Sequence, residues 1–305
     1  MNKRQTIYIG ILIVLVIVFF STKMGNNVEK RINFFQADSA KIKTIEISNI
    51  KDTLRLSKKN DEWMLVYPFE YPTNEYQINN LFSKVLNVKT SNLPISESES
   101  SFDTYKVSNS QGTLIKFIDE NDEVLDEAII GKSSSSKTTP VRRPDDNKIY
   151  KLEDNINYIT TPNADNWREK TILEIEEYNI AKISILNELN AYELILSDSL
   201  WNYVDDKSTL SVEFDNKTLR SILSTLSKLT VNGFIDNKYE DYREKLISSN
   251  LEIEIELFDG SIHYLRIAID KDPKYVLQLN NEEFFMYSVY KDWVDNFTKG
   301  IMDFK

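Results

Sequence analysis

The chain has 305 residues, a formal net charge of −11 at pH 7 and no cysteine. The acidic charge disfavours nucleic acid as a partner, because phosphate backbones repel an acidic surface. The lack of cysteine excludes disulfides, thiol catalysis, thiolate metal sites and a lipid-modified N-terminal cysteine. Aromatic residues make up 11% of the chain, and together with valine and isoleucine they favour a sheet-rich core.

The N-terminus contains a long uncharged run, Gln5–Thr22, with Lys3 and Arg4 before it and Lys23 after it. A helix over this run is about 27 Å long, close to a bilayer hydrocarbon core of about 30 Å. The following residues offer no pair of small side chains for signal peptidase, so an uncleaved signal anchor is favoured over a cleaved signal peptide. We predict a cytoplasmic tail and transmembrane anchor at residues 1–23. Its membrane positions include Ile7, Ile11, Leu15, Val18 and Phe20.

The charges around this anchor predict its orientation. A short basic tail before a first apolar segment usually stays in the cytoplasm. Residues 23–305 are therefore expected outside the cytoplasm. A tether at residues 24–38 would connect the membrane helix to the globular part of the chain.

Two segments resemble each other at a spacing of about 138 residues. In the first, Ile45 lies in the strand-like Lys43–Ile47 and is followed 18 positions later by Trp63. In the second, Ile183 is followed at the same interval by Trp201. The stretches between them alternate polar and apolar residues, which predicts half-buried strands. This pattern favours packing of the repeated unit for the two tryptophans, with ligand contact as the alternative.

An amphipathic helix is predicted after each tryptophan. The first is Asn74–Val88 and the second is Asp215–Leu229, both with apolar residues at i, i+3, i+4 and i+7. Asn74 and Asp215 are the expected N-caps. Further strands are expected after each helix, at residues 114–118, 124–130 and 148–152 in the first unit and at 251–258, 261–269 and 283–289 in the second.

Each unit therefore has the predicted order β-β-β-α-β-β-β, an α+β meander sheet with one helix across it. The predicted lobes are residues 39–160 and 179–305, and residues 161–178 connect them, with a short helix beginning at Trp167. Repeats of this size indicate tandem domains. A coincidental similarity between two ordinary α+β segments is the alternative.

The motifs that resemble chemical sites are incomplete. Gly131-Lys132-Ser133 resembles the end of a phosphate-binding loop, but Asp126 occupies the position of the required earlier glycine. Asp119, Asn121 and Glu123 resemble the start of a calcium loop that lacks its glycine. The single histidine, His263, is expected on a strand surface. We therefore predict no catalytic residue, no metal and no cofactor.

Four residues are candidates for an interface. Arg142 and Arg143 are expected at the tip of a flexible loop, Lys132–Asn147, where contact with an anionic partner and simple solvation are the alternatives. Trp167 and Trp293 lie near helix-like polar segments and are candidates for an interface between the lobes.

The segment Glu62–Pro72 (EWMLVYPFEYP) runs directly into the helix that carries Ile78, Leu81 and Leu86. This pattern resembles the bacterial domain of unknown function 4340 family, which also shares the N-terminal membrane segment, the early Lys-Ile strand and the repeated unit. Asn166–Leu173 is similar to the family's segment before the second unit. The resemblance spans roughly residues 36–300 and includes Pro68 among the packing residues.

In the second unit Val204-Asp205-Asp206 replaces the region of Pro68, so the two lobes are not expected to present the same surface. The resemblance implies a setting at the bacterial cytoplasmic membrane, beside an ABC transporter whose auxiliary subunit resembles gliding-motility components. No catalytic residues follow from it.

Our leading hypothesis is a single-pass, non-enzymatic accessory subunit with its C-terminal domain in the periplasm. Its expected partners are the lipid bilayer and ABC transporter subunits, including an auxiliary protein with a large extracytoplasmic domain. The alternatives are a sensor or carrier with a peptide, glycan or lipid in a cleft between the lobes, and a hydrolase that uses two carboxylates.

Overall fold

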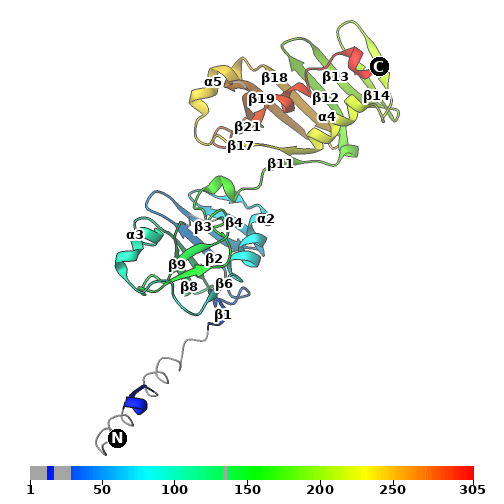
Figure 1. Ribbon diagram of the computed structural model, residues 1–305. Coiled ribbons are helices and arrows are strands. Elements are labelled where there is room, and N and C mark those ends of the chain that lie inside the picture. Colours follow the sequence, from blue (N-terminus) through cyan, green and yellow to red (C-terminus); the bar gives the residue numbers. More distant parts are fainter. Residues whose placement is uncertain (1–11, 17–28, 133–135, 272) are drawn as a thin grey trace, which may run out of the picture. The chain divides into compact units, whose positions relative to one another are not determined.

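The computed structural model describes residues 12–16, 29–132, 136–271 and 273–305 (Figure 1). The chain divides into two compact units, unit 1 (Met1–Arg168) and unit 2 (Glu169–Lys305). Each unit is an α+β structure with antiparallel strand pairs and few helices, as predicted. The division falls inside the connector predicted at residues 161–178.

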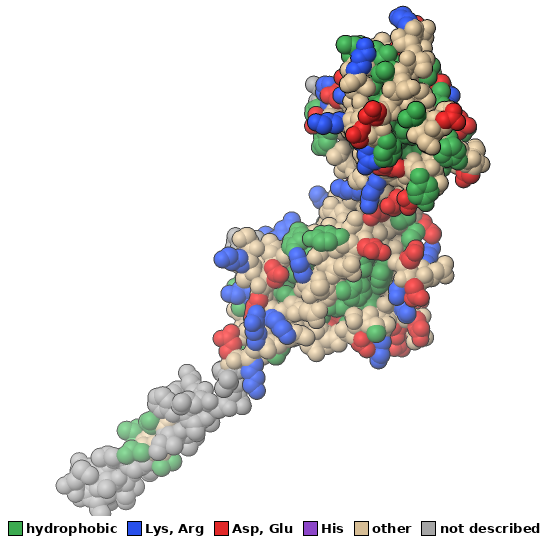
Figure 2. Space-filling model, turned by 90° about the vertical axis from the view of Figure 1, so that its right-hand side faces the viewer, with side chains coloured by type: hydrophobic (Ala, Val, Ile, Leu, Met, Phe, Trp, Pro, Cys, Tyr) green, Lys and Arg blue, Asp and Glu red, His purple; other side chains and the backbone are tan. Residues whose placement is uncertain are grey.

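Only part of the predicted membrane anchor is described. Residues 12–16 are helical, and their five apolar side chains are 45–62% exposed; Figure 2 shows these side chains in green. Leu15 belongs to this stretch, whereas Ile7, Ile11, Val18 and Phe20 lie outside the described residues. Within the described residues, no helix has the length and apolar character needed to cross a membrane.

Unit 1 is built on a ten-stranded sheet in the order β1-β6-β10-β9-β8-β7-β2-β3-β4-β5. Its strands are β1 (Arg31–Asn33), β2 (Thr44–Ser48), β3 (Thr53–Lys59), β4 (Glu62–Tyr67), β5 (Tyr71–Pro72), β6 (Lys89–Ser91), β7 (Thr113–Ile118), β8 (Val124–Ile130), β9 (Thr139–Arg142) and β10 (Ile149–Leu152). The alternation read from the sequence is confirmed in β2, where Ile45 and Ile47 are fully buried and the residues between them are half-buried.

The helix predicted at Asn74–Val88 is divided into α2 (Glu75–Asn80) and a π-helical turn, η1 (Leu81–Val85). Asn74 is the N-cap, as predicted, and its side chain accepts a hydrogen bond from the Gln77 N–H. The predicted apolar stripe faces the sheet, with Ile78, Leu81 and Val85 buried. Two short helices follow elsewhere in unit 1, η2–α3 (Glu99–Ser101 and Phe102–Tyr105) and η3 (Ala164–Asn166).

Three predictions for unit 1 are wrong. The tether expected at residues 24–38 already belongs to the fold from β1 onward, because Phe34 and Phe35 are buried and Phe35 packs edge-to-face on Phe117. The loop expected at Lys132–Asn147 contains β9, which pairs with β8 and β10. The short helix expected from Trp167 is absent among the described residues, where η3 ends before it.

Unit 2 contains a nine-stranded sheet in the order β15-β14-β13-β12-β18-β19-β20-β21-β17, and a separate pair, β11-β16. Its strands are β11 (Thr171–Glu174), β12 (Ile180–Asn187), β13 (Ala191–Ser197), β14 (Leu200–Val204), β15 (Thr209–Val212), β16 (Lys228–Thr230), β17 (Gly233–Phe234), β18 (Leu251–Leu257), β19 (Ile262–Lys271), β20 (Lys274–Leu279) and β21 (Tyr287–Tyr290). Its helices are η4 (Glu177–Asn179), α4 (Lys217–Ser227), α5 (Tyr239–Ile247), α6 (Lys291–Asp295) and η5 (Ile301–Phe304).

Helix α4 covers one face of this sheet (Figure 1) and buries Leu219, Ile222, Leu223 and Leu226 of the predicted stripe. The fifth predicted member, Leu229, is also buried but lies in β16. Burial of each such side chain stabilises the fold by about 1.5–3 kcal/mol. The predicted N-cap was one residue too early, because Asn216 accepts hydrogen bonds from the N–H groups of Thr218 and Leu219. The last predicted strand starts later, in β21, and β20 was not predicted.

A cluster of buried aromatic rings links the sheet of unit 2 to the C-terminus. Tyr192 and Tyr203 stack with ring centroids 5.1 Å apart, and Phe304 packs against both. Burial, together with a hydrogen bond to Asp205, raises the pKa of Tyr203 to about 12. Burial also raises the pKa of Tyr192.

These pKa shifts predict alkaline destabilisation of unit 2. An unfolded tyrosine loses its proton near pH 10, so between pH 10 and 12 the folded state holds protons that the unfolded state has released. The free energy of unfolding should be steady below pH 10 and then fall by up to about 1.4 kcal/mol per pH unit for each tyrosine. Urea unfolding of the full chain at pH 9, 10 and 11 measures this slope. Tyr203→Phe should reduce it, and an unchanged slope in that variant would contradict the assignment.

Candidate docking surfaces

The outer strands of each sheet determine where another chain can pair with the backbone, because an edge strand leaves N–H and C=O groups unpaired. In unit 1, β5 ends in Pro72, which has no N–H. The next residue, Thr73, forms an antiparallel bridge with Arg168, and the Asn74 N–H donates to the Trp167 carbonyl at 2.7 Å. Proline and a later segment of the chain therefore close this edge.

The outer strand β15 of unit 2 is open. It contains four residues, Thr209–Val212, with neither proline nor charge. It pairs with β14 on one side, and no strand of the described chain lies on its other side. Thr209 and Ser211 are exposed, whereas Val212 is buried and holds the strand on the core.

The other outer strands of the two large sheets are shorter, and β11 of the separate pair, which has four residues like β15, ends in the charged Glu174. In unit 1, β1 has three residues and begins with Arg31, whose side chain pairs with Glu153. In unit 2, β17 has only two residues. Because backbone pairing increases with strand length, β15 is the strongest candidate for addition of a partner strand.

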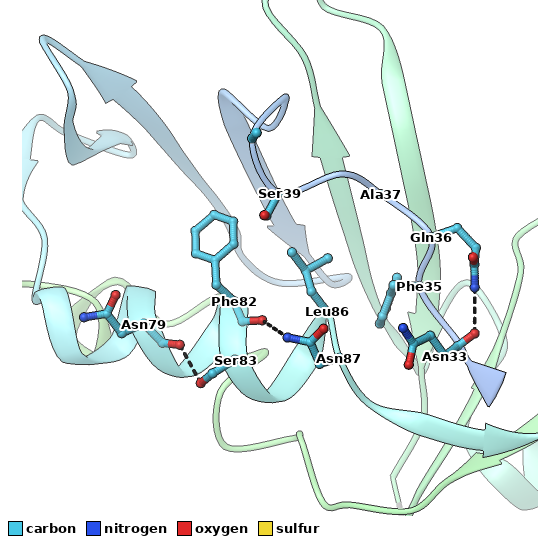
Figure 3. Close-up of a pocket in the computed structure, with 11 residues that line it drawn as sticks. Asn33, Phe35, Gln36, Ala37, Ser39, Asn79, Phe82, Ser83, Leu86 and Asn87 are labelled. Carbon is cyan, nitrogen blue, oxygen red and sulfur yellow. Dashed lines mark hydrogen bonds between the residues drawn. The ribbon is translucent and has the colours of Figure 1, made fainter. Parts of the chain in front are cut away.

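A groove of about 710 Å³ forms a second candidate surface, entirely within unit 1 (Figure 3). One wall is helical, with Asn79, Ser83 and Asn87 along it and Phe82 projecting between the walls. The other wall is the irregular segment that follows β1, residues 33–40. This volume lies within the range of about 300–1,000 Å³ found for ligand sites.

The helical wall contains the π turn. The Leu86 N–H donates to the Leu81 carbonyl at 3.2 Å, one residue further than in an α-helix. The Asn87 side-chain amide donates to the Phe82 carbonyl at 3.1 Å. The extra residue changes the direction of the side chains that follow, and π turns frequently occur at functional sites.

The opposite wall is held to the sheet by an ion pair between the buried Asp126 carboxylate and the half-buried Arg143. The Asp126 carboxylate accepts from the Gln36 N–H at 2.6 Å and from the Arg143 guanidinium. Arg143 also donates to the Phe34 carbonyl at 2.8 Å and lies over the Phe34 ring, 4.4 Å from its centroid. Burial lowers the pKa of Arg143. The pair therefore fixes the backbone at Phe34 and Gln36, where this wall begins.

The groove lining combines hydrogen-bonding and apolar side chains without any charge. Its polar members are Asn33, Gln36, Ser39, Asn79, Ser83 and Asn87, and its apolar members are Phe35, Ala37, Ala40, Phe82 and Leu86. Such a lining can donate and accept hydrogen bonds and provide apolar contact. None of these side chains can take up a proton or bind a charged group by ion pairing.

The residues predicted for repeat packing have different environments. Trp201 is 2% exposed in the core of unit 2. Trp63 is half-buried and contacts the Phe82 ring at a centroid distance of 5.7 Å. Pro68 is exposed, after a cis peptide bond with Tyr67, so it does not contribute the packing predicted for it.

The four predicted interface residues pack within their own units. Arg142 is 4% exposed and donates to the Val107 carbonyl, so it is not at the tip of a flexible loop. Arg143 is half-buried and forms the ion pair with Asp126 described above. Trp167 is 1% exposed, and Trp293 is half-buried against Phe297. The loop prediction was wrong because β9 pairs on both sides and draws the two arginines into unit 1.

The incomplete motifs are structural turns and surfaces. The Asp119 carboxylate accepts from the N–H groups of Glu123 and Asn121, and these bonds, led by the one from Glu123, lower its pKa. His263 is half-buried in β19, with Asn280 as a neighbour at 3.5 Å. The described residues contain no group of three side chains placed to hold a metal ion.

The sequence analysis did not identify either candidate surface. Asn33 and Gln36 lie in the predicted tether, and Thr209–Val212 lies between two predicted elements. Two signals were present in the sequence. Leu210 and Val212 alternate with polar residues, and Asn79, Ser83 and Asn87 recur every four residues on the polar side of a predicted helix.

The fold defines this chain as an α+β protein of two antiparallel-sheet units. A family model described as Domain of unknown function (DUF4340) matches residues 63–245, more than half of the chain. The chain belongs to this family. No curated protein and no solved structure matches it. The match includes the helical wall of the groove and β15, but not the groove wall at residues 33–40.

Proposed function

We propose that this chain is a non-enzymatic accessory subunit that docks an ABC transporter complex, with β15 as the docking edge. The observation that carries the proposal is the open edge of β15, which contrasts with the closed edge of β5. An extended segment of a partner, such as a large extracytoplasmic auxiliary subunit, could add to β15 as the next strand. Backbone hydrogen bonds would supply affinity, and alternate side chains would supply specificity.

The order of strands supports the idea that the two units are copies of one module. In unit 1 the sheet runs β5-β4-β3-β2-β7-β8-β9-β10 and continues with β6. In unit 2 it runs β15-β14-β13-β12-β18-β19-β20-β21 and continues with β17. In both units the strands before the helix pair with the strands after it, through β2 and β7 in unit 1 and through β12 and β18 in unit 2. A strand that lies between these two groups in the sequence, β6 or β17, pairs at the far end of the second group. If the units are copies, β5 and β15 are equivalent outer strands, and the open edge of β15 is a feature that unit 2 acquired.

The N-terminal sequence supports attachment to the bacterial cytoplasmic membrane. The run Gln5–Thr22 is uncharged, and the described helical residues 12–16 expose apolar side chains on five consecutive positions, which covers all sides of a helix. With the basic tail in the cytoplasm, both units would lie in the periplasm and meet the transporter from that side.

A lysine on the β15 edge tests the docking mode. Thr209→Lys should weaken retention of transporter subunits by at least about tenfold, equivalent to about 1.4 kcal/mol, because lysine on an edge strand opposes strand addition. The measurement is co-purification of the full chain in mild detergent, with the retained proteins quantified by mass spectrometry. Thr209 is exposed, so folding of unit 2 should be unchanged.

Thr53→Lys is the matched control, because Thr53 is exposed on β3, a strand with neighbours on both sides. It should retain the partner normally. Equal retention by the Thr209→Lys variant would exclude β15 as the docking edge. A wild-type chain that retains no transporter subunit would overturn the accessory role itself.

A further inference from the structure

We infer that the groove of unit 1 is a second binding site, which holds an extended, uncharged polypeptide segment between its helical wall and residues 33–40. This site is separate from the β15 edge. It lies within one unit, unlike the ligand cleft between lobes considered from the sequence.

The neutral lining disfavours charged ligands, although the Lys89 ammonium donates to the Asn33 side chain and Asp38 lies in the same wall segment. None of the eleven lining residues is charged. A phosphate, carboxylate or ammonium group that entered the groove would lose hydration without gaining an ion pair. Neutral hydrogen-bonding groups do not carry this penalty, so the groove favours peptide groups or hydroxyls over charged ligands.

The helical wall offers side-chain amides that can bind a peptide backbone. Asn79 and Asn87 are both exposed on this wall, and each side-chain amide offers donors and an acceptor. A peptide group offers the complementary N–H and C=O. The two amides lie at opposite ends of the wall (Figure 3), so they can contact separate peptide groups of one extended segment.

The existing hydrogen bonds orient the wall for this role. The Asn87 amide N–H donates to the Phe82 carbonyl, which holds its oxygen as an acceptor for a ligand. The Ser83 hydroxyl donates to the Asn79 carbonyl at 2.7 Å, so its own oxygen also remains an acceptor. Figure 3 shows both bonds along the helix.

The aromatic residues of the groove favour a polypeptide over a sugar. A sugar ring packs best on an open, flat aromatic face. Phe35 is 2% exposed, and Phe82 already packs against Trp63. Phe82, which is half-buried and projects between the walls, can instead contact a side chain of an extended segment along its edge.

A displayed library of random nonapeptides tests this inference with the full chain as bait. The wild-type chain should enrich peptides that contain a run of uncharged residues. One enriched peptide is then labelled, and its binding is titrated by fluorescence anisotropy. Ser83→Glu places a charge in the helical wall and should weaken binding at least about tenfold. Asn87→Ala should weaken binding less, because it removes one amide.

Ser224→Glu is the matched control, because Ser224 is exposed on α4 and its hydroxyl also donates to a helical carbonyl. It should bind the peptide as the wild type does. The inference would be overturned if no peptide is enriched, if the enriched peptides are charged, or if Ser83→Glu binds normally.

Binding of a neutral oligosaccharide that Ser83→Glu abolishes would overturn the polypeptide as the ligand and identify a glycan instead. The Thr209→Lys variant should bind the peptide normally, so failure here and failure of docking at β15 are distinguishable.

Discussion

Trp201→Ala is expected to destabilise unit 2 by about 3–5 kcal/mol, the usual cost of removing a large buried aromatic side chain. Trp201 is 2% exposed and belongs to the main core of unit 2. Trp63→Ala should cost unit 1 only about 1–2 kcal/mol, because Trp63 is half-buried and loses less apolar contact. The two tryptophans hold the same position in the sequence pattern, so burial alone predicts the difference.

Hydrogen exchange of the full chain, followed by mass spectrometry, can assign each loss to its unit. Peptides from β12–β14 should lose protection in Trp201→Ala, and peptides from β2–β4 should change little in Trp63→Ala. Trp201→Phe serves as the control and should restore part of the stability. Equal losses in the two alanine variants would mean that the repeat position, rather than burial, determines the contribution of the tryptophan.

Arg143→Ala is expected to destabilise unit 1 by about 3 kcal/mol. The Asp126 side chain is 5% exposed, and the substitution leaves its carboxylate without its cationic partner. Removing one member of a buried pair typically costs about 3–5 kcal/mol, and because the Arg143 side chain is 30% exposed we expect the lower end of this range. The substitution also removes the bond to the Phe34 carbonyl, so the groove wall at residues 33–40 should exchange its amide protons faster.

Arg55→Ala provides the comparison for this prediction. Arg55 pairs with Glu46 at 2.7 Å, but its side chain is 49% exposed, and such pairs contribute at most about 1 kcal/mol. Urea unfolding of both variants measures the two free energies. A loss for Arg143→Ala no larger than for Arg55→Ala would show that the Asp126 pair is not needed to hold the wall.

The two units illustrate how equivalent positions acquire different surfaces. At one sheet end, unit 1 has Pro72 and a bridge to Arg168, whereas unit 2 has the unblocked residues Thr209–Val212. The sequence analysis noted that Val204-Asp205-Asp206 departs from the Pro68 region, but it did not connect this departure with a change at the sheet edge. That connection depends on which strand is outermost, and strand order is a property of the folded sheet.

Local sequence patterns were sufficient to predict several strands, the two main helices and one N-cap. Alternation predicted β2, β3, β12 and β13, because side chains in a strand point to opposite faces with a period of two. The apolar stripes predicted α2 and α4, and Asn74 was recognised as an N-cap because its side chain bonds within three residues. The pattern Glu62–Pro72 also identified the family, which the match over residues 63–245 confirms.

By itself, the sequence therefore determined the family, the α+β class, the principal strands and the buried stripes of the two main helices. Only the tertiary structure decided the assignment of β1 and β9, the burial of Arg142, the ion pair of Arg143, the groove and the open edge of β15. The physical reason is how far apart in the sequence the contacting residues lie. Strands and caps depend on neighbouring residues, but the bond from Arg143 to the Phe34 carbonyl joins residues 109 positions apart, and no local pattern encodes such a contact.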